Sequence, residues 1–167
     1  MLAVSAVLSA LGVVVMLLGT VISVLDLTMV AIASIFVFFA IIEMGKPYQY
    51  LIYVTTSVLA VLLLPDKFSA VLYIVFGGIY PVLKQKLEKL PNLISWILKA
   101  VYFNLVLVAT VLGAKYLFNV DEEELTLMLF AVGNAAFFLY DIAMTKLITY
   151  YLLGLRKKFR IEKYFNK

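Results

Sequence analysis

The sequence predicts an all-α membrane protein, a six-transmembrane-helix bundle with both termini cytoplasmic. Of its 167 residues, 65% are hydrophobic and only 14% are charged, whereas a soluble domain is about half apolar and about a quarter charged. Apolar runs near the roughly 20 residues that cross a bilayer recur along the chain. Lysine and arginine gather in alternate connections between these runs, as they do in membrane proteins of fixed orientation.

Charged residues, prolines and polar clusters divide the chain into six apolar runs, each of which is predicted to be one membrane-spanning helix. In chain order, the predicted spans cover about residues 2–24, 27–42, 48–64, 68–83, 93–118 and 125–153. The connections between them are too short for another domain. Residues 1–167 are therefore predicted to form a single transmembrane domain that ends in a basic cytoplasmic tail, 154–167.

Each boundary has a local signal. Only Leu25 and Asp26 separate the first two spans, which must form a tight hairpin. Pro65 begins the polar turn that ends the third span, and Pro91 stops the polar extension of the fourth. The acidic turn at 121–124 precedes the sixth span, where acidic residues suit a helix start. The first span lacks a positive leader and has a long apolar core, so it is expected to be a retained helix and not a signal peptide.

Positive charge predicts the orientation. With a cytoplasmic amino terminus, twelve of the fourteen Lys and Arg residues lie inside, and only Lys67 and Lys115 lie outside. The asymmetry of Lys and Arg determines orientation, so both termini are predicted to be inside. The net charge of +4 then reflects topology in a lipid bilayer and not nucleic-acid binding.

The composition also excludes classes of chemistry. The chain has no His and no Cys, which removes Ser-His-Asp and Cys-His nucleophiles, iron–sulfur clusters and ordinary zinc sites. Asp141 is the only acid well inside a predicted span, so the carboxylates do not group as a metal-dependent transferase or an intramembrane aspartyl protease requires. We therefore expect no enzyme activity, no metal and no cofactor.

The first span carries small residues at helical spacing. They are Ala3, Ala6 and Ala10, and, further round the helix, Ser5, Ser9 and Gly12. Small residues three or four positions apart let a second helix approach closely, which matters in lipid because packing replaces the hydrophobic drive. Two interpretations stay open: internal packing against another span, or a docking face for a separate protein.

Lys99 and Asp141 are ionisable groups inside spans, where an unpaired charge is expensive. Their numbers are symmetric about position 120, in the turn between the fifth and sixth spans, so the two residues are expected at equal depth. Opposite charges at equal depth predict a buried ion pair, which is either structural or functional. Alternatively, the Lys99 side chain snorkels to the cytoplasmic surface.

The fourth span contains Gly77, Gly78 and Pro81. Two glycines remove side-chain bulk, and proline cannot donate a backbone hydrogen bond, so a helix kink is expected here. Such a kink is either a moving part of a transporter or an ordinary feature of a membrane helix.

A few polar groups are expected to converge around the outer mouth of the bundle. The ligand pocket predicted there consists of Asp26, Asp66, Tyr73, Lys115, Asn119 and Asn134. Aromatic and apolar walls with a few polar groups are typical of small-molecule sites. Asn134 has small neighbours, and two interpretations of it stay open: its amide forms hydrogen bonds either with a ligand or with another helix.

Six spans, two inside termini, a short chain and the Ala6-x-x-x-Ala10 pattern make the sequence resemble the substrate-binding S components of energy-coupling factor (ECF) vitamin transporters. The stretch from Leu62 to Lys67 and on through Tyr80 to Lys84 is also similar to small bacterial membrane proteins of this S-component-like kind. The resemblance implies a bacterial cytoplasmic membrane protein that captures a vitamin or micronutrient on its outer side. It also implies docking of the small face of the first span on a coupling transmembrane subunit driven by two ATPase subunits.

No signature of the riboflavin, thiamine, biotin or folate members is present, which favours a small apolar or aromatic ligand. Two other functions stay open. The first is a non-transporting integral membrane scaffold or assembly subunit of a larger complex. The second is a lipid-handling membrane protein with the Lys99 and Asp141 region near headgroups.

Overall fold

The computed structural model describes residues 1–21, 25–118 and 127–158. Within these ranges every regular element is a helix. The chain divides into two compact units, which are described separately: unit 1 comprises Met1–Gln85 and Arg156–Lys167, and unit 2 comprises Lys86–Leu155. The expectation of a single domain stays a prediction.

The helices follow the predicted spans closely. In chain order they are α1 (Leu2–Val21), α2 (Asp26–Glu43), α3 (Tyr48–Leu63), α4 (Lys67–Leu72), the π-helix η2 (Tyr73–Gly77), α5 (Tyr80–Leu87), α6 (Asn92–Phe118), α7 (Leu127–Tyr150), the π-helix η4 (Tyr151–Leu155) and α8 (Arg156–Lys158). Among the described residues, five helical stretches are long and apolar enough to cross a membrane. They are Leu2–Thr20, Asp26–Glu43, Lys67–Leu87, Asn92–Leu112 and Phe130–Leu155.

Besides these five stretches, the described residues include one shorter apolar helix, α3. Its 16 residues extend about 24 Å at 1.5 Å per residue, less than the roughly 30 Å of a typical hydrocarbon core. The fold is therefore all-helical and compatible with a multi-pass membrane protein. The count of six spans and the orientation of the termini stay predictions.

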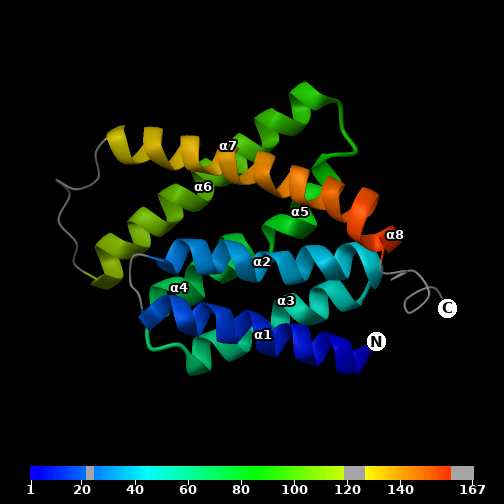
Figure 1. Cartoon of the computed structure of the whole chain (residues 1–167). Helices are drawn as coiled ribbons and strands as arrows, with labels where there is room; N and C mark the ends of the chain where they lie inside the picture. Colours follow the sequence, from blue (N-terminus) through cyan, green and yellow to red (C-terminus); the bar gives the residue numbers. More distant parts are fainter. Residues whose placement is uncertain (22–24, 119–126, 159–167) are drawn as a thin grey trace. The chain divides into compact units, whose positions relative to one another are not determined.

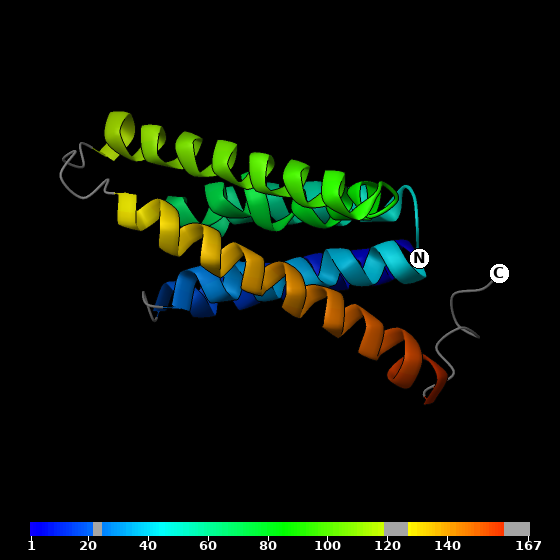
Figure 2. The same ribbon diagram turned by 90° about the horizontal axis from the view of Figure 1, so that it is seen from above.

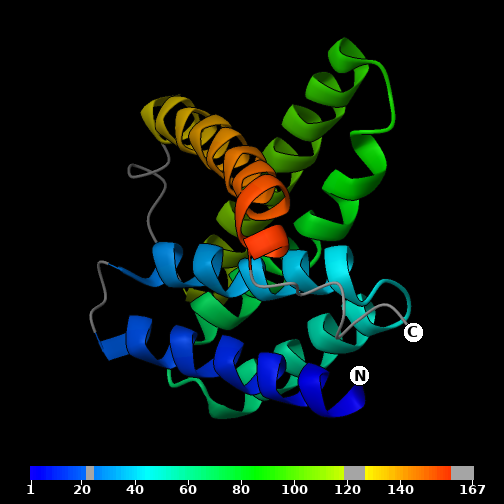
Figure 3. The same cartoon turned by 45° about the vertical axis from the view of Figure 1, so that its right-hand side comes forward.

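Unit 1 is built on α1, α2 and α3, which pack against one another. The helices α1 and α2 lie side by side (Figures 1 and 3). Small and β-branched residues make this close packing possible, because they leave little bulk between the helix axes. The main buried apolar cluster consists of Val13, Met16, Val30, Ala33, Ala60, Leu64, Ala70, Leu72 and Tyr73. A second cluster of Val37, Ala40, Ile52 and Val82 joins α2, α3 and α5.

The fourth predicted span changes its helical form where the glycines and the proline occur. The α-helix α4 passes into η2, Gly78 and Ile79 form a turn, and α5 begins at Tyr80. Pro81 lies in the first turn of α5, where a missing backbone N–H leaves no intrahelical hydrogen bond unmade. A Cβ atom on Gly77 would lie 2.7 Å from a Val30 methyl carbon, so this glycine permits the close approach of α2.

The turn between α3 and α4 is held by two neighbouring charged residues. The Lys67 ammonium donates hydrogen bonds to the carbonyls of Val61 and Leu64 at 2.8 and 2.7 Å, which caps the end of α3. Asp66 is the N-cap of α4. Its carboxylate accepts hydrogen bonds from the Phe68 and Ser69 backbone N–H groups and from the Ser69 hydroxyl.

Asp66 should make the stability of unit 1 depend on pH. Partial burial raises the pKa of Asp66, but the three hydrogen bonds to its carboxylate outweigh burial, so the pKa lies below its ordinary value. A carboxylate whose pKa is lower in the folded than in the unfolded state adds to the free energy of unfolding. This contribution is fully present above the unfolded-state pKa and is lost as pH falls through the folded-state pKa. Asp66→Ala should lower the free energy of unfolding by about 1 kcal/mol at neutral pH, and the difference should vanish in acid below the ordinary aspartate range.

Denaturant unfolding of the detergent-solubilised protein at a series of pH values measures this effect. Asp66→Asn is the matched control, because an asparagine caps a helix without titrating. It should retain most of the stability at neutral pH. A constant difference between wild type and Asp66→Ala down to strongly acidic pH would contradict the assignment.

Unit 2 consists mainly of α6 and α7, two long helices that run in opposite directions (Figure 2). Their contact is partly aromatic, since the rings of Phe103 and Phe137 stack with centroids 4.5 Å apart. A Cβ atom on Gly133 would lie 2.8 Å from the Leu107 side chain. Both pairs of residue numbers are symmetric about position 120, as a hairpin of two antiparallel helices requires. Most other large apolar side chains of these helices are exposed.

Candidate functional site

The helix α1 has two faces of small residues, and the structure separates them. Ser5, Ser9 and Gly12 are buried in unit 1, and a Cβ atom on Gly12 would lie 3.2 Å from a Thr56 side-chain carbon. At 100° per residue, the centre of this face lies about 125° around the helix from the centre of the alanines. Ser5, Ser9 and Gly12 are packed internally, so they are not available to a separate protein.

The alanine face of α1, defined as Ala3, Ala6 and Ala10, is exposed. Its neighbours Val7, Leu11 and Val14 are exposed too. A shallow apolar strip with small residues at its centre is a surface onto which another helix fits closely. Of the six small residues that the sequence offered as a docking face, only these three alanines are therefore accessible to a partner.

A ladder of polar side chains joins α6 to α7. The Lys99 Nζ atom lies 3.0 Å from Asp141 Oδ2 and 3.3 Å from Glu88 Oε1. The side chains of Lys99 and Asp141 are only 4% and 2% exposed, whereas that of Glu88 is 43% exposed. The Trp96 ring lies under the ammonium, with its centroid 5.2 Å from Nζ, which adds a cation–π attraction.

Nearer the middle of the same helices, the amides of Asn104 and Asn134 exchange two hydrogen bonds of 2.9 and 3.0 Å. Each amide also donates to the carbonyl four residues earlier on its own helix, Ala100 for Asn104 and Phe130 for Asn134. These paired amides fix the register of α6 against α7, because a shift of one residue would separate them. Asn134 therefore bonds a helix and not a site at the bundle mouth.

Three residues of the expected ligand pocket lie in unit 1 and have different surroundings. Tyr73 is 0% exposed within the core of unit 1, and Asp66 is the N-cap of α4. Asp26 is half-buried, close to the position a Gly19 Cβ atom would take. Asn119 and the side chain of Lys115 lie outside the described residues. Among the described residues, no three acidic groups are placed to hold a metal ion.

Sequence reasoning missed the ion pair between Arg156 and Glu43. The Arg156 Nε atom lies 2.8 Å from Glu43 Oε1, and the Glu43 side chain is 0% exposed. Both residues were counted only as charges that set the orientation, because each follows or ends an apolar run. Lys84, which is 1% exposed, was likewise assigned to a polar surface extension. The position of Glu43 at the very end of a span is the signal by which it could have been predicted to form an ion pair.

Comparison with known proteins finds no matching family model, no similar curated protein and no similar solved structure. The site is therefore described by its own geometry. That geometry consists of an exposed alanine face on α1 and a buried polar ladder between α6 and α7.

Proposed function

We propose that this protein is a substrate-capturing membrane subunit of an ECF-type uptake transporter, located in a bacterial cytoplasmic membrane. Its partners are a coupling transmembrane subunit and two ATPase subunits, which supply the energy that a chain without nucleotide-binding motifs does not. Its ligand is a small apolar or aromatic molecule. The observation that carries the proposal is the exposed alanine face of α1.

The alanine face supports docking because of what surrounds it. A separate face of α1 is already packed through Ser5, Ser9 and Gly12, whereas Ala3, Ala6 and Ala10 are exposed. A helix that meets only lipid gains nothing from small side chains, since lipid accommodates any apolar residue. Close approach of a second helix does need them.

The proposal predicts the partners and the effect of filling the face. Purification of a tagged protein from its native membrane should recover a polytopic coupling subunit together with two ATPase subunits. Ala6→Trp combined with Ala10→Trp should reduce that recovery at least about tenfold, because two bulky rings would hold the facing helix away, and the loss of close packing is worth over 1.4 kcal/mol. Quantitative mass spectrometry of the purified complexes measures both results.

The matched control is Leu18→Trp. This leucine is 57% exposed on the same helix but lies about two turns beyond Ala10, so recovery should be unchanged. If wild-type protein brings down no ATPase, the transporter assignment is wrong. If the alanine variant binds its partners normally, the docking face is wrong even when the transporter assignment holds.

One observation favours a second candidate, a non-transporting scaffold or assembly subunit. Asn134 forms hydrogen bonds with Asn104, and Asp66 caps the start of α4. Both residues therefore have structural roles. Docking without a ligand would be expected of a scaffold. Mass spectrometry of small molecules that co-purify with the wild-type protein separates the two functions, because only a transporter subunit should carry one.

A further inference from the structure

A shallow, open hollow lies along one face of the last turns of α7 and of η4. Its volume is about 500 Å³, and its walls are Thr145, Lys146, Thr149, Tyr150, Leu153 and Gly154. A π-helix widens the helical turn, and such turns are frequent at functional sites. A Cβ atom on Gly154 would meet nothing nearer than Tyr150 at 4.0 Å, so the glycine leaves the hollow open.

The length of the helix places this hollow at a membrane surface. The apolar stretch Phe130–Leu155 has 26 residues, which extend about 39 Å against a hydrocarbon core of roughly 30 Å. Upright in the bilayer, the stretch would extend about 9 Å beyond the core. Lys146 lies about 13 Å before the carboxyl-terminal end of the stretch, and a charged side chain avoids hydrocarbon, so we place this end at the headgroup surface, which the long Lys146 side chain reaches by snorkelling.

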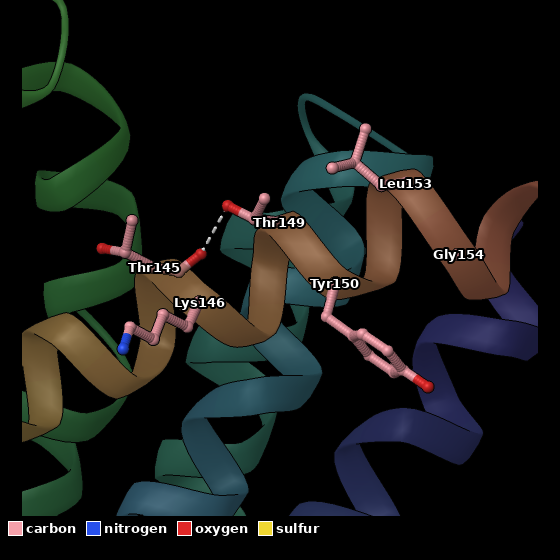
Figure 4. Close-up of a pocket in the computed structure, with 6 residues that line it drawn as sticks. All are labelled: Thr145, Lys146, Thr149, Tyr150, Leu153 and Gly154. Carbon is pink, nitrogen blue, oxygen red and sulfur yellow. Dashed lines mark hydrogen bonds between the residues drawn. The ribbon is translucent and has the colours of Figure 1, made fainter.

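The side chains around the hollow combine charge, hydroxyl groups and apolar surface. Lys146 is the one charged residue among the six, so the hollow carries positive charge without a carboxylate. Figure 4 shows Lys146 and Tyr150 leaving the helix in diverging directions. The Thr145 and Thr149 hydroxyls donate to backbone carbonyls at 2.9 and 2.8 Å, which leaves their oxygens able to accept hydrogen bonds.

We propose that this hollow binds one anionic phospholipid, such as phosphatidylglycerol. The Lys146 ammonium pairs with the phosphate, and the threonine oxygens accept hydrogen bonds from the headgroup hydroxyls. The exposed Tyr150 and Leu153 side chains contact the glycerol and the upper part of the acyl chains. The site lies on α7 and η4, so it is independent of the docking face of α1.

Native mass spectrometry of the whole chain, released from micelles that contain phosphatidylglycerol and phosphatidylcholine with identical acyl chains, tests the proposal. Wild-type protein should retain one phosphatidylglycerol in preference to phosphatidylcholine. Lys146→Gln should reduce that retention about fivefold, the usual contribution of one basic side chain near an anionic surface. Gly154→Leu should reduce it for both lipids, because its side chain fills the hollow.

Lys89→Gln is the matched control, since Lys89 is another exposed lysine on the same predicted side of the membrane but outside the hollow. It should leave retention unchanged, and thermal unfolding should show all three variants folded. Equal retention of the two lipids by the wild type overturns the proposal, as does an equal loss from Lys146→Gln and Lys89→Gln. Displacement of the lipid by inorganic phosphate alone also overturns it, because the site would then bind a free anion.

Discussion

Lys99→Met should destabilise the protein by about 3–5 kcal/mol, among the largest effects of any single substitution. The substitution keeps the length of the side chain but removes the ammonium that lies 3.0 Å from Asp141 Oδ2. The Asp141 carboxylate is 2% exposed, so water cannot replace the lost cation. The contact with Glu88 and the attraction to the Trp96 ring are lost at the same time.

Lys99→Met combined with Asp141→Leu should recover most of this loss, because replacing both members of a buried pair with apolar residues is often neutral. Denaturant unfolding in mixed micelles gives the free energies of unfolding of the wild type, of Lys99→Met, of Asp141→Leu and of the double variant. Lys89→Met is the control for an exposed lysine and should change stability by less than about 0.5 kcal/mol. A double variant as unstable as the sum of the two single variants would show that the pair is not the cause.

The helical fold was predictable because membrane spans are set by length and composition. Predicted and observed helices differ by a few residues at most ends, and the spans at 48–64 and 93–118 correspond to α3 (Tyr48–Leu63) and α6 (Asn92–Phe118). Pro65 and Pro91 end the preceding helical segments, as their missing N–H group requires. The equal-depth argument for Lys99 and Asp141 and the observed 3.0 Å contact agree, because a hairpin has only one register.

The faces of the helices were much harder to predict. In a membrane both the inner and the outer face of a helix are apolar, so periodicity does not separate them as it does in water. The sequence therefore does not separate the buried Ser5, Ser9 and Gly12 from the exposed alanines. The pairing of Asn104 with Asn134 could have been predicted from the sequence, because the two residue numbers are nearly symmetric about the same turn.

The expected outer pocket depended on a different assumption, that polar residues near the same membrane surface point toward one another. Asp66 instead caps its own helix, which is the local alternative open to any aspartate at a helix start. Tyr73, which lies one turn after the buried Ser69 and Ala70, faces the core of unit 1. The composition of the apolar runs predicts neither the capping role of Asp66 nor the burial of Tyr73.

Gly78→Ala should lower the free energy of unfolding by about 2–3 kcal/mol, because it overfills a tightly packed position. An added Cβ atom would overlap one carbon of the Tyr53 ring, and it would lie 2.8 Å from a second Tyr53 ring carbon and 3.0 Å from a Tyr73 ring carbon. A ring is rigid, so the whole Tyr53 side chain must move. Movement of the ring would also break the hydrogen bond from the Tyr53 hydroxyl to the Ile74 carbonyl, which is 3.1 Å long.

This clash has a specific partner, so its removal should rescue the variant. In a Tyr53→Leu background, which has already lost the ring and its hydrogen bond, Gly78→Ala should cost less than about 1 kcal/mol. Gly154→Ala is the control for a glycine with open space around it, and it should have little effect. If Gly78→Ala is equally costly with and without the Tyr53 ring, then its cost comes from the Tyr73 ring or from the backbone of the turn before α5. Tyr53 would then have no part in making a glycine necessary there.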